Sequence, residues 1–200
     1  MKRKKKPLQQ AGYAVILLAA VFMLFQWHTV QNSKRMEERN KSYAEDSARL
    51  MASQIREELK NAQNTVQICA YFLGKSMAQP LVDVQTLKEM EENAGLFDAM
   101  LFTSLEGVDY ISDGRVSDVK DREFYRKGIA GECGMDIVFD PHFYNEIMAC
   151  FYAPVRSNGK IVGVLRGVYL AQERLRDMLS TVYFGEAAGV YLCMPDGRVI

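Results

Sequence analysis

The chain has 200 residues, which is enough for one core of ordinary size or two small ones. Its 25 basic and 25 acidic residues balance, so the net charge by itself indicates no partner. Five of the cations form the cluster KRKKK at residues 2–6, which leaves 20 basic against 25 acidic residues in the rest of the chain. A mildly acidic body argues against nucleic acid as a partner, because phosphate backbones are bound by basic surfaces.

An uncharged segment follows the basic cluster. No Asp, Glu, Lys or Arg occurs from Pro7 to Ser33, and the stretch AGYAVILLAAVFMLF inside this window is almost wholly apolar. About 20 residues of apolar helix cross a hydrocarbon core of roughly 30 Å, so the sequence predicts a transmembrane helix at residues 11–30. Residues 1–10 then form a basic tail in the cytoplasm, and the chain after about residue 31 is extracytoplasmic.

A cleaved signal peptide is the alternative interpretation of this segment. Cleavage requires small residues after the apolar run. The residues at its end are instead bulky, namely Phe25, Gln26, Trp27 and His28. We therefore expect an uncleaved membrane anchor, with the Trp at the membrane interface.

A long helix is predicted over residues 31–80. From residue 34 to about residue 78 there is no proline, the only glycine is Gly74, and helix-forming residues dominate. Apolar residues from Leu50 to Leu73 recur at spacings of three and four, which places them on one stripe of the helix. We expect the polar first part to be a stalk or to pair with a second copy, and the later part to dock on a domain. Pro80 is the expected end.

After residue 80 the spacing of apolar residues changes. The sequence predicts a hairpin at residues 97–114 around the turn LEG and a short helix within DVKDREFYRKGIAG at residues 118–131. Three further strands are expected between residues 134 and 170, the last two joined by a tight turn at SNG. A helix at residues 171–184 and a new hairpin at residues 189–200 complete an α+β pattern.

The order of these elements resembles that of double Cache domains, which are extracytoplasmic sensor domains with a PAS-like antiparallel sheet and flanking helices. The resemblance covers about residues 34–200, and three segments carry it: SDVKDREFYRKGIAG, VFDPHFYNEIMACFYAPVRSNGKIVGVLRGVYL and GVYLCMPDGRVI. It implies a membrane-distal module at residues 81–188 and the start of a second module at residues 189–200. In this family the output is a histidine kinase, a diguanylate cyclase or phosphodiesterase, or a chemoreceptor, and no motif of these occurs in the sequence.

The resemblance also implies a ligand site. In amino-acid-binding members an Arg-x-Trp-Tyr motif holds the ligand carboxylate, and Arg122, Phe124 and Tyr125 match it with Phe in place of Trp. A guanidinium is the natural bidentate partner of a carboxylate. Asp140 matches the family's turn aspartate and is expected to meet an ammonium. Tyr169 replaces the family's later aspartate, so another small anion, a plain carboxylate or a larger polar metabolite fits as well as an α-amino acid.

Three tyrosines are further candidates for the same pocket: Tyr110 from the hairpin, and Tyr152 and Tyr169 from the later strands. Each candidate also has a structural interpretation. Arg122 pairs with a neighbouring acid on the surface, which contributes little to stability, the aromatic residues belong to the core, and Asp140 caps the turn before Pro141.

Enzyme chemistry finds little support in the residues. Of the two histidines, one lies in the predicted membrane interface and the other follows Asp-Pro in a loop, and no nucleophile-elbow pattern occurs. Four cysteines are present, at Cys69, Cys133, Cys150 and Cys193. They form neither a C-x-x-C motif nor a zinc cluster, and no calcium loop is found. Four cysteines could form two disulfides, but the expected strand pairing places Cys150 opposite a residue near Ile137 rather than opposite Cys133, so we expect these two to be unbridged and the thiols to be free. No catalysis, metal or cofactor is expected in this segment.

The sequence as a whole predicts the ligand-sensing region of a membrane-bound signalling receptor. We expect a homodimer that binds a small polar, carboxylate-bearing molecule and signals to a cytoplasmic output domain, a histidine kinase or a diguanylate cyclase or phosphodiesterase. Two alternatives are a membrane-anchored extracellular enzyme, which needs a polar catalytic trio, and a structural coiled-coil anchor, which needs heptads beyond residue 80.

Overall fold

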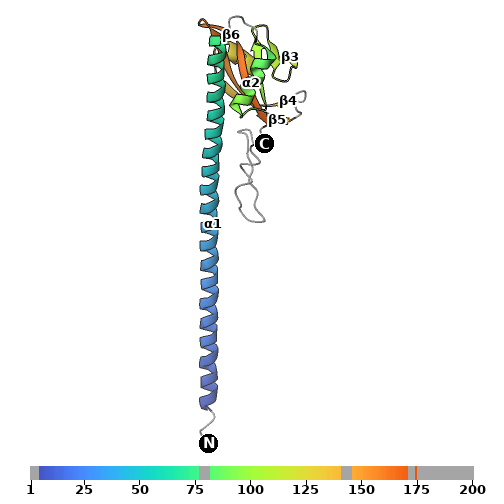
Figure 1. The fold of residues 1–200 in the computed structure, drawn as a ribbon. Helices are drawn as coiled ribbons and strands as arrows, with labels where there is room; N and C mark the ends of the chain where they lie inside the picture. Colours follow the sequence, from blue (N-terminus) through green and yellow to red (C-terminus); the bar gives the residue numbers. More distant parts are fainter. Residues whose placement is uncertain (1–4, 77–81, 141–145, 171–173, 175–200) are drawn as a thin grey trace. The chain divides into compact units, whose positions relative to one another are not determined.

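The structure is a computed structural model, and it describes residues 5–76, 82–140, 146–170 and 174. Side chains are described from residue 17 onward within these ranges, except for those of residues 139, 140 and 146. The chain divides into two units, Met1–Leu50 and Met51–Ile200. Figure 1 shows the elements of both.

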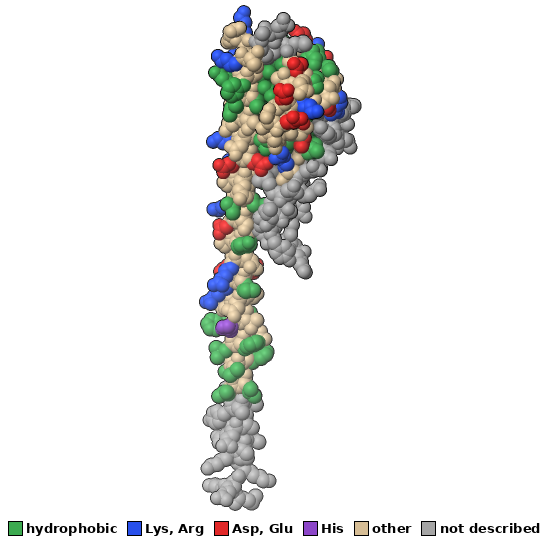
Figure 2. Space-filling model, in the orientation of Figure 1, with side chains coloured by type: hydrophobic (Ala, Val, Ile, Leu, Met, Phe, Trp, Pro, Cys, Tyr) green, Lys and Arg blue, Asp and Glu red, His purple; other side chains and the backbone are tan. Residues whose placement is uncertain are grey.

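Helix α1 (Lys5–Ser76) is continuous over 72 residues. No proline occurs between residues 8 and 76, so no backbone hydrogen bond of the helix is lost to one. In the first unit nearly all described side chains are exposed. Figure 2 shows a hydrophobic stretch along this part of the helix, followed by a histidine and then by Lys and Arg side chains.

The predicted transmembrane helix at residues 11–30 and most of the predicted long helix at residues 31–80 fall within α1. Within the described part of the chain, no helix combines the length and the hydropathy needed to cross a membrane. Residues 11–16 of the predicted span lie outside the described side chains, and Pro80 lies outside the described residues.

The second unit has an α+β fold with a six-stranded antiparallel sheet, in the order β3-β2-β1-β6-β5-β4 (Figure 1). The strands are β1 (Ala99–Ser104), β2 (Val108–Ile111), β3 (Val116–Asp118), β4 (Gly134–Asp140), β5 (Glu146–Ser157) and β6 (Lys160–Leu170). The predicted hairpin is β1–β2, and the three later predicted strands are β4, β5 and β6. Strand β3 was not predicted, because three exposed residues carry no apolar period.

The tight turn predicted between β5 and β6 is confirmed. Asn158 and Gly159 have φ angles of 52° and 79°. Two successive positive φ angles are the mark of a type I′ turn, whose twist matches that of the two strands. This turn and the register shift between Val155 and Arg156 together set the pairing in which Cys150 faces Val168 and Tyr152 faces Arg166.

Helix α2 (Val84–Ala94) was missed by the sequence analysis, although its end signals are ordinary ones. The Asp83 side chain accepts a hydrogen bond from the Thr86 backbone N–H at 2.7 Å, which caps the first turn. Gly95 ends the helix with a φ of 59°. The predicted helix at residues 171–184, apart from residue 174, and the predicted hairpin at residues 189–200 lie outside the described residues.

One face of the sheet packs against α1 and α2 (Figure 1). The helices contribute Ile55, Ala62, Val66, Ala70, Leu73 and Leu87. The strands contribute Met100, Phe102, Ala149, Phe151, Ala153, Val155, Leu165 and Tyr169. The stripe from Leu50 predicted in the sequence is thus largely the docking face of α1, although Leu50 itself is exposed.

The opposite face of the sheet packs against α3 (Glu123–Ile129), the predicted short helix. Its core includes Leu101, Val119, Phe124, Tyr125, Cys150, Tyr152, Val164 and Val168. A side chain at Gly128 would place a Cβ 2.6 Å from Val164 Cγ2, so the glycine permits α3 to lie directly on β6. The N-cap of α3 is Arg122, and its side chain forms no capping hydrogen bond.

Three cysteines lie within the described residues, and all are free thiols. Cys150 pairs in register with Asp136 rather than with Cys133, which agrees with the expectation that these two cysteines are not bridged. Cys150 is buried, Cys69 is half-buried and Cys133 is exposed. Cys193 lies outside the described residues.

The buried Tyr169 makes the stability of the α1-side core depend on pH in the alkaline range. Burial, with a smaller contribution from the Glu58 carboxylate, raises the pKa of Tyr169 to about 12. The unfolded phenol ionises near pH 10, so the stability that the neutral phenol contributes is complete below about pH 10 and falls as the pH rises toward 12. We expect thermal denaturation to show a steeper fall of Tm over this range in the wild type than in Tyr169→Phe. The exposed Tyr71→Phe is the control, and an equal alkaline fall in Tyr169→Phe and the wild type would contradict this prediction.

Candidate functional site

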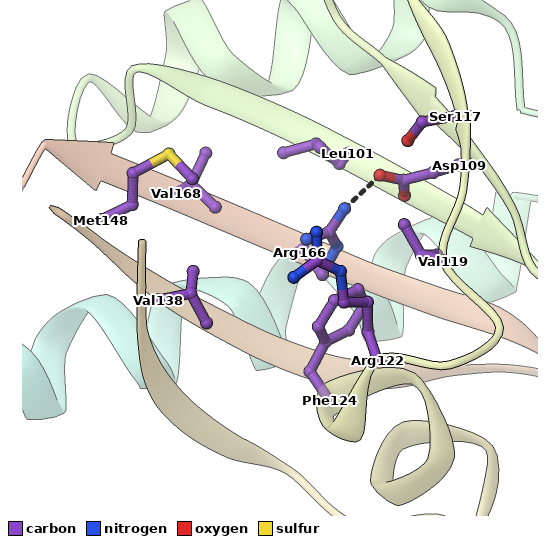
Figure 3. Close-up of a pocket in the computed structure, with 10 residues that line it drawn as sticks. All are labelled: Leu101, Asp109, Ser117, Val119, Arg122, Phe124, Val138, Met148, Arg166 and Val168. Carbon is purple, nitrogen blue, oxygen red and sulfur yellow. Dashed lines mark hydrogen bonds and ion pairs between the residues drawn. The ribbon is translucent and has the colours of Figure 1, made fainter. Parts of the chain in front are cut away.

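A cavity of about 50 Å³ lies between the start of α3 and the sheet (Figure 3). Its lining residues come from α3 and its N-cap, from all six strands of the sheet and from the segment between β3 and α3. They are Leu101, Asp109, Ser117, Val119, Arg122, Phe124, Val138, Met148, Arg166 and Val168. One water-sized sphere takes about 10–15 Å³ of such volume, so the cavity holds about four of them.

A buried ion pair forms the polar end of the cavity. Asp109 is 1% exposed and Arg166 is 7% exposed, and the guanidinium Nη2 donates to the Asp109 carboxylate. The second oxygen of this carboxylate accepts a hydrogen bond from the Thr103 hydroxyl at 2.7 Å. Both carboxylate oxygens therefore already have donors.

Arg166 has further contacts that fix its position. Its Nη1 donates to the Cys150 sulfur at 3.7 Å, and its Cζ lies 4.0 Å from the centre of the Phe124 ring. A guanidinium over an aromatic face is held by the quadrupole of the ring as well as by packing. The Nε of Arg166 is buried and has no hydrogen-bond partner among the described residues.

Burial is the largest influence on the pKa values of the groups at the polar end of the cavity. It raises the pKa of Asp109, while the Arg166 charge and the Thr103 hydroxyl act in the opposite direction. Burial also raises the pKa of the Cys150 thiol, which lies in the same core. Because arginine does not deprotonate in proteins, the guanidinium of Arg166 needs the carboxylate beside it.

The other end of the cavity is apolar. Figure 3 shows Val138, Met148 and Val168 on one side of the cavity and Asp109 and Ser117 on the other. Strands β4, β5 and β6 supply these three apolar residues at positions that alternate with those facing α1. The cavity is thus amphipathic, with charge at one end and hydrocarbon at the other.

A wider hollow of about 630 Å³ adjoins the cavity and shares Arg122, Phe124 and Val138 with it. Its remaining lining comes from the start of α3 and from β4. These residues are Asp121, Glu123, Arg126, Met135, Asp136 and Ile137. The side chain of Arg122 thus lies where the small cavity meets the wide hollow.

The structure places two of the predicted site residues, Arg122 and Phe124, at the cavity. Tyr125 lies on the buried side of α3, and its phenol donates to the Leu105 carbonyl at 2.7 Å. Tyr152 is buried on the same face of the sheet, with its ring 6.5 Å from that of Phe124, but it does not line the cavity.

The other predicted residues lie elsewhere. Tyr110 and Tyr169 pack into the core on the α1 side of the sheet, so the structure does not bring them to the cavity under α3. Asp140 is the last residue of β4, and its side chain lies outside the described ones.

Sequence reasoning missed Asp109 and Arg166. The signal was a charged residue within each of two mainly apolar segments, Asp109 in VDYI and Arg166 in IVGVLRGVYL. Strand alternation places Arg166 on the same face as Val164 and Val168, and Tyr169 on the other. A charge on the buried face of a strand requires a partner, which the hairpin supplies.

The ion pair gives a testable prediction for stability. Removing one partner leaves a buried charge uncompensated, so we expect Asp109→Ala to lower the free energy of unfolding by about 3–5 kcal/mol. The double variant Asp109→Leu with Arg166→Met removes both charges, so its free energy of unfolding should fall clearly less than that of Asp109→Ala. Denaturant unfolding measures both.

The control for this prediction is Asp113→Ala. Asp113 pairs with Arg115 at 2.6 Å, but both side chains are exposed, so its removal should cost at most about 1 kcal/mol. A loss at Asp109 no larger than the loss at Asp113 would argue against a structural role for the buried pair.

Comparison with known proteins supports the fold. No protein-family model and no curated protein matches the chain. Solved structures do match. The ligand-binding domain of the Pseudomonas fluorescens chemoreceptor CtaA, in complex with L-serine, is 16% identical with a TM-score of 0.65, covering 82% of this chain and 71% of that one.

Two further matches are of the same kind. The ligand-binding domain of the Pseudomonas aeruginosa amino acid chemoreceptor PctC, in complex with GABA, is 20% identical with a TM-score of 0.64, covering 79% of this chain and 73% of that one. The sensory domain of the Campylobacter jejuni chemoreceptor Tlp3 is 11% identical with a TM-score of 0.64, covering 76% of this chain and 67% of that one.

The chain spans only part of the length of these domains, down to 60% for Tlp3 in complex with 4-methylisoleucine. Identities at this level establish the fold. The chain therefore has the fold of these chemoreceptor sensory domains, which is the Cache-type fold that the sequence predicted.

Proposed function

We propose that this chain is the extracytoplasmic ligand-sensing region of a membrane-bound signalling receptor, and that it binds a small carboxylate-bearing molecule in the cavity under α3. The observation that carries the proposal is the convergence of two guanidinium groups, those of Arg122 and Arg166, on one cavity of a sensor fold. Such groups are the natural partners of a carboxylate.

The similar structures support a small-molecule ligand. Tlp3 is seen with isoleucine, PctC with GABA and CtaA with L-alanine, all of which carry a carboxylate. At the identities found, these ligands say nothing about which molecule this chain binds.

The membrane anchor is part of the proposal. Residues 7–33 carry no charged side chain, and the basic cluster at residues 2–6 precedes them. Exposed hydrophobic side chains support it, since Leu17, Phe22 and Phe25 are each more than 60% exposed on the helix. On this proposal residues 1–10 are cytoplasmic, residues 11–30 cross the membrane and the later residues are extracytoplasmic.

Signalling on this proposal passes from the cavity to α1. The sheet carries the cavity on one face, and its other face packs on α1 from Ile55 to Leu73. A ligand that displaces α3 or the sheet would therefore also displace α1. We propose that α1 pairs with its copy in a homodimer. The exposed apolar side chains of Ile68, Tyr71 and Phe72 support this pairing. The output, a histidine kinase or a diguanylate cyclase or phosphodiesterase, lies outside these residues.

Arg122→Ala tests the ligand site. We expect the variant to unfold at nearly the wild-type Tm without ligand, since the Arg122 side chain is exposed. Its affinity for the carboxylate that binds the wild type should fall by about tenfold to a hundredfold, because a hydrogen bond to a charged group contributes about 1.5–3 kcal/mol. Thermal shift and calorimetric titration with propionate, L-alanine, succinate and GABA measure the change.

Arg115→Ala is the matched control, because Arg115 is also an exposed cation but lines neither of the hollows described above. It should keep the wild-type response to every probe. Unchanged affinity in Arg122→Ala for the probe that stabilises the wild type would overturn the assignment of the cavity.

A further inference from the structure

We propose that the free edge of β4 binds an extended segment of another polypeptide as an additional strand of the sheet, antiparallel to β4 and with a lysine or arginine opposite Asp136. This inference goes beyond the proposed ligand site, which lies on one face of the sheet, because it concerns the edge. Three observations lead to it: the place of β4 at the end of the sheet, the course of the wider hollow, and the charge that this strand carries.

Strand β4 forms one end of the sheet. In the order β3-β2-β1-β6-β5-β4 it pairs with β5 on one side only (Figure 1). It is seven residues long, so its edge extends over about 24 Å. None of the backbone hydrogen bonds between described residues reaches its other side. An unpaired edge of this length can serve as a template for another strand.

The strand register shows which backbone groups of β4 face outward. In an antiparallel sheet, successive residues of a strand direct their N–H and C=O groups to opposite neighbours. The Val168 carbonyl accepts from the Asp98 N–H at 2.9 Å, on the β1 side of β6. The residues of β6 on either side of Val168 therefore point to β5, and Cys150, opposite Val168, points to β4. Asp136, opposite Cys150, points back to β5.

The neighbours of Asp136 on β4 consequently have outward backbone groups. Met135 and Ile137 direct their N–H and C=O groups away from β5, which leaves two donors and two acceptors along the edge. An extended polypeptide offers donors and acceptors at this same spacing of two residues. Main-chain hydrogen bonds of this kind supply the affinity when a peptide adds to a sheet.

The wider hollow of about 630 Å³ runs along this edge. Four successive residues of β4, 135–138, line it. Because successive side chains of a strand point to opposite faces, a space that touches four in a row follows the backbone rather than one face. The other wall of the hollow is the start of α3, from Asp121 to Arg126. There is therefore room for a strand between β4 and this helix.

The charge on β4 specifies a side chain of the partner. Asp136 is the only charged residue among the four residues of β4 that line the hollow, and it is half-buried. Burial raises the pKa of its carboxyl, and the nearby Lys127 acts in the opposite direction. The Lys127 ammonium is paired with Glu123 at 2.7 Å, so a cation on the added strand gives Asp136 a further partner. Opposite charges directly across two strands stabilise their pairing.

The rest of the hollow is compatible with a cation on the added strand. Its whole lining holds three carboxylates and two guanidinium groups, so it is not positively charged. The partner that fits is thus an extended segment with apolar residues on one face and a cation on the face toward α3.

Blocked peptides test the proposal by calorimetric titration of the 200-residue chain in micelles of an uncharged detergent. The probe is acetyl-TVKVKVT-amide. When its lysines lie on the face of Asp136, its valines lie on the face of Met135 and Ile137. Directly opposite residues share a face, so in antiparallel addition the N–H groups of the valines point to β4. We expect saturable binding, and its absence at millimolar peptide would overturn the proposal.

N-methylated peptides separate strand pairing from other modes of binding. Methyl groups on the valine nitrogens remove the donors to β4 and should weaken binding by at least about tenfold. Methyl groups on the lysine nitrogens lie on the outer side of the added strand and should leave the affinity nearly unchanged. An equal loss with both peptides, or a larger loss with the second, would contradict antiparallel addition to β4.

Two variants of the chain assign the binding to β4. Ile137→Pro removes an outward N–H and none that points to β5, and proline is tolerated at such positions of an edge strand. It should weaken the probe by at least about tenfold and leave the circular dichroism spectrum unchanged. Val116→Pro is the matched control, because it alters the opposite edge strand β3, where Val116 is 60% exposed. It should keep the wild-type affinity, and an equal loss in both variants would count against β4.

Asp136→Lys tests the charge and serves if Ile137→Pro does not fold. It should weaken acetyl-TVKVKVT-amide and strengthen acetyl-TVEVEVT-amide, in which glutamates replace the lysines. Tighter binding of the glutamate peptide to the wild type, or the same order of the two peptides in the variant, would reject Asp136 as the residue that selects the partner.

A second copy of the chain is the other occupant that an edge strand can take. The sedimentation of Ile137→Pro without peptide would then differ from that of the wild type, and such a shift would overturn the assignment of the edge to a foreign strand. The outcomes of these peptide experiments do not depend on carboxylate binding under α3, so this inference and the proposed function can fail separately.

Discussion

The Asp109–Arg166 ion pair is the interaction on which the α3 side of the molecule depends. It joins β2 to β6 across the intervening β1, and both side chains are almost completely buried. Taking two charges out of water costs several kcal/mol per ion, and this cost is offset by their contact, by the Thr103 hydroxyl and by the Phe124 ring over the guanidinium. A pair of apolar residues would fill the space at lower cost. A gain in stability alone therefore does not explain the ion pair, and its position at the cavity supports the proposed ligand site.

Because side chains alternate along each strand, the two faces of the sheet carry different kinds of residue. Residues of β6 that face α1, such as Leu165 and Tyr169, pack in a core of hydrocarbon and rings. Their neighbours Arg166 and Val168 face α3 and line the cavity. A shift of one residue in the register would exchange these two sets. The turn at Asn158 and Gly159 and the register shift between Val155 and Arg156 therefore matter to the site as well as to the fold, because together they fix which set faces α3.

The fold was largely predictable, because its long elements carry strong periods and its turns carry Asn-Gly and similar signals. Helix α2 and the three-residue β3 were missed: the first had clear caps at Asp83 and Gly95 that were not used, and the second had no pattern to read. At the site, Arg122 and Phe124 were predictable from a local motif. The partners that complete the cavity, Asp109 and Arg166, lie 57 residues apart in the sequence. The strand register that brings them together cannot be predicted from any local sequence pattern.

The packing of α3 determines how it can move. Gly128 rests directly on Val164, and the Tyr125 phenol is tied to the Leu105 carbonyl, so the buried side and the far end of this helix are fixed to the sheet. From Arg122 to Gly128 the backbone rises by about 9 Å. The buried side of the helix is thus packed on the sheet from Phe124 to Gly128, whereas Arg122, its N-cap, is exposed. The arginine can therefore change its position with the occupant of the cavity while the packing of the helix is kept.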